Sequence, residues 1–333
     1  MDHRISVAPM MGYTDRHYRK LLRLISPNAV LYTEMVVASA LTVGNATSLL
    51  THGDDAPCVL QLGGNDPREL AQAAKLGEAA GYQAINLNVG CPSDRVQSGT
   101  FGACLMAQPA LVADCIAAMQ DAVTVPVTVK TRIGIAERHA NHEHPEDFEF
   151  FRHFVETVHA AGCRTFIIHA RKAILSGLSP RENREIPPLR YDFVYRIREA
   201  FTDATFILNG GLKTVDAVTD ALSRVDGVML GRIACSNPLM LADLEVEIFQ
   251  NRMADRLSIL ADYRDYIDQQ MHEGENFRHM VRHLLGLFNG CTGARAFRRH
   301  LSEHMTRDDA GSSLIDDALQ ISGVHRQAIP TGT

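Results

Sequence analysis

The chain has 333 residues, 46% of them hydrophobic, and a formal net charge of −6 at pH 7. This length provides material for two domains, or for one large barrel with a smaller unit. No apolar run reaches the ~18 residues of a transmembrane helix, and the opening lacks a signal-peptide core. We therefore expect a cytoplasmic protein that does not enter a membrane.

Short apolar runs alternate with helical segments along the first 240 residues. Eight runs have the composition of buried strands: 5–9, 30–33, 58–62, 84–88, 127–130, 165–169, 206–209 and 227–230. Asp66, followed by Pro67 and Glu69, predicts a helix start, and Thr214 or Asp216 caps a later helix. Regular alternation of strands and helices predicts parallel strands joined by right-handed crossovers.

Eight strand–helix units in this length favour a TIM barrel, which typically needs about 250 residues. The alternative is a doubly wound sheet, but its glycine-rich turn is absent after the first strand, where Pro9-Met10-Met11-Gly12 stands. Beyond the barrel, the pattern predicts helices over 241–271, 277–288, 294–305 and 313–321. We expect a catalytic barrel over 1–240 and a helical domain over 241–333, with a frayed tail from Gly323.

Polar side chains stand where the predicted strands end. They are Glu34, Gln61, Asn88 with Cys91 close behind, Lys130, His169, Asn209 and Arg232. A single polar strand end carries little meaning, since a lysine can reach the rim and a histidine can be satisfied in the core. In a TIM barrel, however, the carboxyl ends of all strands meet at one face. The pattern therefore predicts one polar pocket.

The last two strands end in glycines, which predicts a phosphate site. Asn209-Gly210-Gly211 follows the seventh strand and Gly231-Arg232 the eighth. Loops at these places often bind phosphate through backbone N–H groups, and an arginine adds a charged donor. Lys130 supplies a cation, and Gln61 an amide for a heteroaromatic edge. Together these groups are what flavin mononucleotide, FMN, requires.

Cys91 lies between Gly90 and Pro92 at a strand end, where packing does not call for a thiol. The other six cysteines are expected to be small buried side chains, and no C-x-x-C pair predicts a disulfide or zinc site. The histidine-rich segment 139–144 resembles a metal site, but a solvated loop is the better interpretation. We expect no metal.

Arginines are concentrated in two stretches despite the acidic net charge. Between 278 and 299 there are five arginines and no acidic residue, at positions Arg278, Arg282, Arg295, Arg298 and Arg299. A second basic stretch holds Arg171, Lys172, Arg181, Arg184 and Arg190, diluted by Glu182 and Glu185. Solvated helix faces explain any single arginine. Such local patches also let an acidic protein bind RNA.

Several segments resemble the tRNA-dihydrouridine synthase family, and most of all its subfamily A. They are AINLNVGCPSDRVQSG, FGACLM, VTVKTRIGI, FIIHARKA, SGLSPRENREIPPL, LNGG and DGVMLGR. The resemblance runs from the Ala8-Pro9-Met10 opening to the arginine-rich helices. It implies an FMN-containing TIM barrel with a helical tRNA-binding domain. It also implies that uridines 20 and 20a in the tRNA D loop are reduced to 5,6-dihydrouridine with NADPH.

The resemblance also implies roles for individual residues. Cys91 matches the catalytic cysteine. The flavin would be lined by Pro9, Met10 and Met11, contacted by Gln61, Lys130 and His169, and held at its phosphate by Asn209, Gly210, Gly211, Gly231 and Arg232. The tRNA side would be formed by Asn88, Arg181, Arg184, Arg295 and Arg298.

The reaction needs a hydride at C6 of uracil and a proton at C5. A thiol with a pKa near ~8.5 is a suitable proton donor, so we interpret Cys91 as a general acid that a glycine-bearing loop brings into place. Two alternatives are another FMN barrel, such as a dihydroorotate-dehydrogenase-like or ene-reductase enzyme, and a non-catalytic RNA-binding module. The first leaves the arginine-rich helices unexplained, and the second leaves the polar strand ends unexplained. We expect a monomer.

Overall fold

The computed structural model describes residues 1–43, 46–93, 99–136, 147–252 and 255–324. Segment 139–144 and most of the expected tail lie outside these residues. The described chain divides into two compact units. The barrel unit comprises residues 1–11, 30–52 and 56–231, and the helical unit comprises 12–29, 53–55 and the chain from 232 onward.

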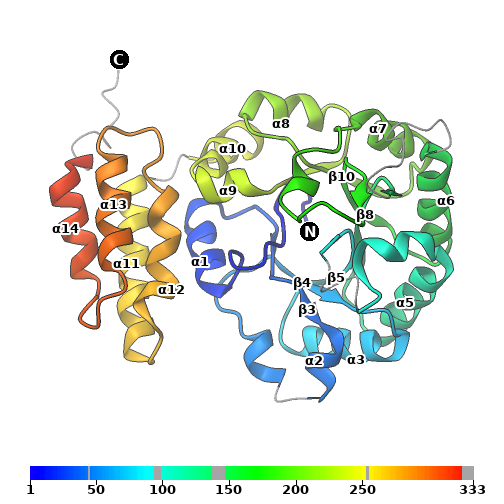
Figure 1. Cartoon of the computed structure of the whole chain (residues 1–333), viewed down its shortest axis with the longest axis horizontal. Helices are drawn as coiled ribbons and strands as arrows, with labels where there is room; N and C mark the ends of the chain where they lie inside the picture. Colours follow the sequence, from blue (N-terminus) through cyan, green and yellow to red (C-terminus); the bar gives the residue numbers. More distant parts are fainter. Residues whose placement is uncertain (44–45, 94–98, 137–146, 253–254, 325–333) are drawn as a thin grey trace. The chain divides into compact units, whose positions relative to one another are not determined.

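Eight parallel strands form a closed ring in the barrel unit (Figure 1). In chain order they are β1 Ile5–Val7, β2 Leu31–Tyr32, β4 Cys58–Gly63, β5 Ala84–Val89, β6 Val127–Arg132, β8 Thr165–His169, β10 Thr205–Asn209 and β11 Gly227–Leu230. Their order around the sheet is β1-β11-β10-β8-β6-β5-β4-β2. A parallel bridge between Ser6 and Val30 joins the two ends. The predicted TIM barrel is thus confirmed, and the doubly wound sheet is excluded.

Helices surround the strands, as the alternating pattern predicts (Figure 1). They are α2 Ala38–Val43, α3 Pro67–Ala79, α5 Pro109–Ala122, α6 Asp147–Ala160, α7 Tyr191–Ala200 and α8 Val215–Leu222. The Asp66 carboxylate caps α3 by accepting from the backbone N–H groups of Arg68 and Glu69. Thr214, one of two candidates, caps α8. Short elements fill the connections: β3 Val36–Val37, β7 Ile135–Ala136, β9 Ala173–Ile174, and the 3₁₀ turns η1 Ala46–Leu50, η2 Gly102–Ala107 and η3 Glu182–Arg184.

Apolar side chains in or next to seven of the eight strands, all except β6, fill one buried cluster. It consists of Ala8, Val30, Tyr32, Val59, Ala84, Ile167, Ile207 and Met229, and Met10 packs against it. A TIM barrel is filled in this way by layers of side chains from its strands. The cluster closes the interior, so function is left to the carboxyl ends of the strands.

The helical unit begins with α1 Arg16–Ile25, and the remaining helices follow the barrel. They are α9 Arg232–Ser236, α10 Met240–Phe249, α11 Arg256–His272, α12 Phe277–Val281, the 3₁₀ turn η4 Arg282–Gly286, α13 Ala294–His304 and α14 Ser313–Ser322. The expectation of one helix over 241–271 is wrong: α10 ends where Gln250 adopts a left-handed conformation, with φ of 56°. Among the described residues, no helix is long and apolar enough to cross a membrane.

Candidate active site

The predicted pocket residues of the barrel unit gather at the carboxyl end of the ring, because all eight strands are parallel. Asn88 on β5 lies opposite Lys130 on β6, and His169 on β8 lies opposite Asn209 on β10. Met10 rests on the apolar cluster below them, whereas Met11 is exposed. The other predicted cofactor residues at this end are Pro9, Gln61, Gly210, Gly211 and Gly231. Arg232 begins α9 and belongs to the helical unit.

Buried amides form a chain of hydrogen bonds across three neighbouring strands. Asn88 Nδ2 donates to Gln61 Oε1 at 2.9 Å, and Gln61 Nε2 donates to Asn86 Oδ1 at 2.7 Å. Asn86 Nδ2 in turn donates to Thr128 Oγ1 at 2.9 Å. All four side chains are at most 8% exposed. The amide orientations are therefore fixed by one another. The sequence did not assign roles to Asn86 and Thr128, although an asparagine inside a buried strand was the available signal.

In the turn that carries Cys91, the backbone N–H and carbonyl groups of Gly90 and Cys91 all make hydrogen bonds. Asn88 Oδ1 accepts from the N–H groups of Gly90 at 3.1 Å and Cys91 at 3.0 Å. Arg132 Nε donates to the Gly90 carbonyl at 3.0 Å, and the N–H of Ala103 donates to the Cys91 carbonyl at 2.9 Å. The thiol is half-buried, and its Sγ lies 3.4 Å from Ser93 Oγ. These four hydrogen bonds orient the backbone segment from which the thiol projects.

A cluster of cations lies beside this turn. Lys130 Nζ donates to Asn209 Oδ1 at 3.1 Å, and Asn209 Nδ2 donates to the Met229 carbonyl at 2.7 Å. Burial, and then the nearby Arg132 charge, lowers the pKa of Lys130 to about 7. The same two causes hold the pKa of His169 well below its usual range, so its imidazole is neutral. The strand ends thus hold the Lys130 amine, whose charged form a bound anion would stabilise, beside the charged Arg132.

The glycines at the ends of β10 and β11 differ in backbone conformation and in the space that a Cβ atom would have. Gly210 and Gly211 have φ of +113° and +76°. A Cβ on Gly210 would come within 2.6 Å of His169 Cδ2, and one on Gly211 within 2.5 Å of Leu189 Cδ1. A Cβ on Gly231 would meet nothing within 4 Å. Gly210 and Gly211 are therefore required by the backbone and its close neighbours, whereas Gly231 leaves open space at the end of β11.

The loop that carries Arg181 and Arg184 is organised around buried Asn183. Its side chain accepts from the Ile174 N–H at 2.7 Å and donates to the Ile174 carbonyl at 2.9 Å. Arg181 and Arg184, on either side of it, are exposed. The loop thus presents two arginines to solvent from a fixed backbone.

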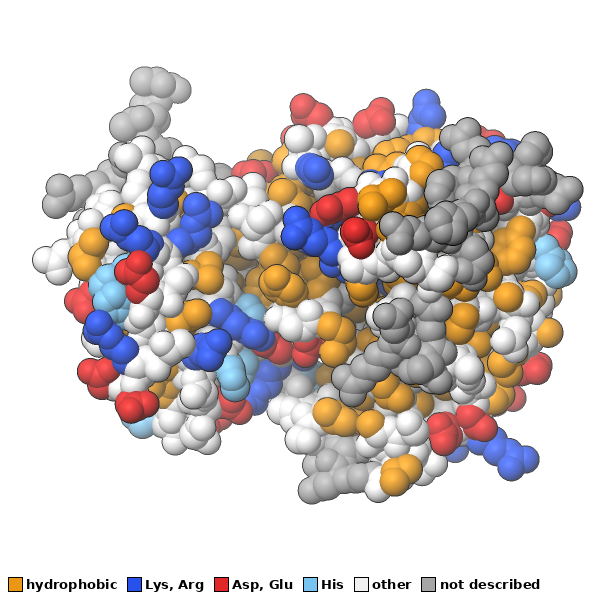
Figure 2. Space-filling view, viewed as in Figure 1, with side chains coloured by type: hydrophobic (Ala, Val, Ile, Leu, Met, Phe, Trp, Pro, Cys, Tyr) orange, Lys and Arg blue, Asp and Glu red, His pale blue; other side chains and the backbone are white. Residues whose placement is uncertain are grey.

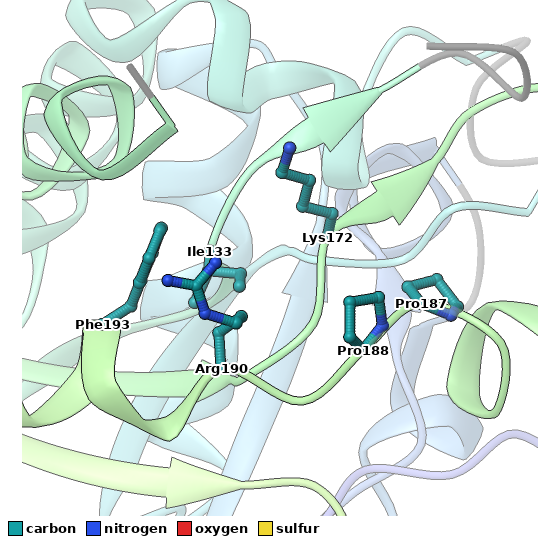
Figure 3. Close-up of a pocket in the computed structure, with 6 residues that line it drawn as sticks. All are labelled: Ile133, Lys172, Pro187, Pro188, Arg190 and Phe193. Atoms are coloured by element: carbon teal, nitrogen blue, oxygen red, sulfur yellow. The ribbon is translucent and has the colours of Figure 1, made fainter. Parts of the chain in front are cut away.

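A small pocket beside this loop is distinct from the polar strand ends. It is lined by Ile133, Lys172, Pro187, Pro188, Arg190 and Phe193 (Figure 3). Lys172 pairs with Asp147, and Arg190 pairs with Asp192 at 2.9 Å while lying over the Phe193 ring. Both cations thus have carboxylate partners, and none of the predicted site residues lines this pocket.

The helical unit exposes much of the predicted basic stretch. Basic side chains gather on the face of this unit seen in Figure 2. Arg295 and Arg298 lie one turn apart on α13 and are exposed, as are Arg278 and Arg299. Arg282 instead pairs with Asp15, whose carboxylate also accepts from His283 at 3.0 Å and caps α1. One of the five arginines therefore holds the helices of this unit together.

The fold is that of a TIM barrel, and known proteins share it. A solved structure of 2-naphthoyl-CoA reductase with 2-naphthoyl-CoA has a similar fold, with a TM-score of 0.54 and 11% identity over 76% of this chain and 50% of that one. The family model "Dihydrouridine synthase (Dus)" matches residues 6–322.

Two proteins described as tRNA-dihydrouridine(20/20a) synthase are close in sequence. The one from Shewanella oneidensis is 48% identical over 96% of this chain and 94% of its own. The one from Escherichia coli strain K12 is 50% identical over 96% of this chain and 91% of its own. The chain therefore belongs to the dihydrouridine synthase family, and it is a flavin-dependent oxidoreductase.

Proposed function

We propose that this protein reduces uridines 20 and 20a of tRNA to 5,6-dihydrouridine, with FMN as its cofactor, NADPH as the electron donor and Cys91 as the proton donor. The observation that carries the proposal is the Cys91 turn at the carboxyl end of the barrel, whose backbone makes four hydrogen bonds, three of them with the side chains of Asn88 and Arg132. The two relatives, whose names state this specificity, support the tRNA positions. We also propose that the protein acts as a cytoplasmic monomer.

The residues present fit FMN. Gly231 leaves open space at the end of β11, and Gly210 and Gly211 turn the chain away after β10. These turns, with Asn209 and Arg232, would hold the phosphate. Lys130, His169 and Gln61 would contact the ring, and Pro9, Met10 and Met11 would line it. Lys130 offers a proton-accepting amine with a pKa of about 7, which a bound anion would keep charged.

The chemistry that bound, reduced FMN would supply is a hydride for C6 of the uracil. The protein then has to provide a proton at C5, and a thiol is mostly protonated at neutral pH. Cys91 delivers this proton from Sγ. The hydrogen bonds of the turn would orient the backbone that carries this thiol, and movement of the glycine-bearing loop stays part of the proposal. Positioning of this kind lowers the entropic part of the barrier.

The exposed arginines would bind the RNA. Arg181 and Arg184 project from a fixed loop of the barrel unit, and Arg295 and Arg298 from one face of α13. Phosphate contacts of this kind position an RNA without reading its sequence. Residues 241–333 would act mainly in tRNA binding and residues 1–240 in catalysis. The target uridine has to leave its stack to reach the barrel.

One experiment separates this function from the alternatives. The purified protein should be yellow, NADPH should bleach it under anaerobic conditions, and tRNA lacking dihydrouridine should restore the colour while dihydrouridine appears at positions 20 and 20a. If the yellow colour were restored by a small enone, or by a substrate of dihydroorotate-dehydrogenase-like enzymes, but not by tRNA, the protein would be a different flavin enzyme. A colourless protein that binds tRNA would indicate a binding module.

A further inference from the structure

Arg132 connects the Cys91 turn to the loop that carries Arg181 and Arg184. Its Nε donates to the Gly90 carbonyl at 3.0 Å, and its Nη1 donates to the carbonyls of Lys172 and Asn183, each at 2.9 Å. The side chain is 3% exposed. One guanidinium therefore joins three chain segments that follow different strands. Its planar fork of donors suits several acceptors at fixed angles, which an ammonium does not reproduce.

We propose that Arg132 is a positioning residue that sets the Cys91 turn and the arginine-bearing loop in one arrangement, and that its charge faces the thiolate left when Cys91 has given up its proton. The proposal rests on the proposed function, because that function supplies the reaction in which Cys91 donates a proton. The positional part stands on the three carbonyl contacts alone.

The charge balance around Arg132 agrees with this role. Burial lowers the pKa of Arg132 to about 9, the Cys91 thiolate opposes that shift, and the Arg184 and Arg171 charges add to it. Cys91, Arg184 and Arg171 thus lie within electrostatic range of this guanidinium. An RNA phosphate that neutralises Arg184 would remove a repulsion from Arg132.

The test uses Arg132→Ala and the milder Arg132→Lys, which keeps the charge but loses the fork. Both variants should bind FMN and be reduced by NADPH at close to the normal rate. Reoxidation of the reduced enzyme by tRNA should fall about 100-fold, as expected for a misplacement of about 1 Å. Free guanidinium ion should partly restore Arg132→Ala, and methylammonium should not. Arg23→Ala is the matched control, because Arg23 also donates to backbone carbonyls, but within the helical unit.

Hydrogen–deuterium exchange supplies a readout that does not depend on the substrate. In both Arg132 variants, peptides covering 84–93 and 174–186 should exchange faster together, and in Arg23→Ala neither should. The proposal is overturned if the two peptides keep their normal exchange, or if tRNA reoxidises the variants as fast as the unaltered enzyme. If tRNA fails to reoxidise the unaltered enzyme, the proposed function is wrong, and the exchange data still decide the positional role.

Discussion

Asn88 Oδ1 accepts a hydrogen bond from the backbone N–H of Cys91 at 3.0 Å. The same oxygen accepts from Gly90, and the amide nitrogen of Asn88 donates to Gln61. Asn88 thereby links the predicted proton donor to a predicted flavin contact through one side chain. Its predicted place beside the substrate is compatible with this role, because the amide lies at the end of β5.

Replacing Asn88 should therefore slow the step that uses the thiol. Asn88→Ala removes the acceptor for both N–H groups, and the rate at which tRNA reoxidises the reduced enzyme should fall about 100-fold. Asn88→Asp keeps an acceptor for both N–H groups, although it loses the donation to Gln61 and adds a buried charge, so the tRNA-dependent rate should fall less than in Asn88→Ala. Stopped-flow measurement of flavin absorbance gives both rates. Equal losses in the two variants would contradict a positioning role for Oδ1.

Alanine substitutions at two glycines of the predicted phosphate site should have different effects, one on FMN affinity and the other on the stability of the fold. Gly231→Ala adds a Cβ that meets nothing within 4 Å, so the melting temperature of the cofactor-free protein should stay unchanged while FMN affinity falls. Gly210→Ala places a Cβ near His169 at a positive φ and should cost stability of about 1–3 kcal/mol. Calorimetry and FMN titration distinguish them. Normal FMN affinity in Gly231→Ala would place the phosphate elsewhere.

Lys130 should take up a proton when the cofactor binds. Its pKa of about 7 in the free protein means that the amine is largely neutral at about pH 8 and largely charged at about pH 6. An anion bound beside it raises that pKa. Titration calorimetry in buffers of different ionisation enthalpy should show uptake approaching one proton at the higher pH and little at the lower. Lys130→Met should abolish the difference, and uptake that persists in this variant would assign the proton to another group.

The arginines on α13 should govern the salt dependence of tRNA binding. Arg295 and Arg298 are exposed on one helix face, so replacing both with alanine should weaken binding and reduce the slope of log affinity against log salt by about 1–2. Flavin reduction by NADPH should be unaffected. Arg152→Ala is the control, because Arg152 is exposed but paired with Glu149 and Glu156. A change in slope for Arg152→Ala, and none for the pair, would move the RNA surface elsewhere.

Periodicity in the sequence was sufficient for the barrel, because each strand–helix unit carries its own local signals. The Asp66 cap and the eight apolar runs correspond to observed elements. The division of 241–271 into two helices could not be predicted, since it depends on a left-handed Gln250, a conformation that its type does not signal. The polar strand ends were recognisable because buried strands rarely need them.

The contacts that individual polar and charged side chains make were harder to predict from the sequence. Arg132 reads as one more polar residue after an apolar strand, and only the fold brings the carbonyls of Gly90, Lys172 and Asn183 around it. Arg282 illustrates the converse, because its charge suggested RNA, yet it pairs with Asp15. Sequence spacing identifies which strand ends meet, whereas backbone acceptors and long-range ion pairs depend on loop geometry.

The central claim, that Cys91 donates the proton to the uracil, is tested most directly by single-turnover reoxidation of Cys91→Ala by tRNA lacking dihydrouridine. The variant should hold FMN and be bleached by NADPH at the normal rate. The account predicts that its reoxidation and its dihydrouridine yield then fall by about 100- to 10,000-fold, the usual contribution of a positioned general acid. Reoxidation at the normal rate, with dihydrouridine formed at positions 20 and 20a, would contradict it.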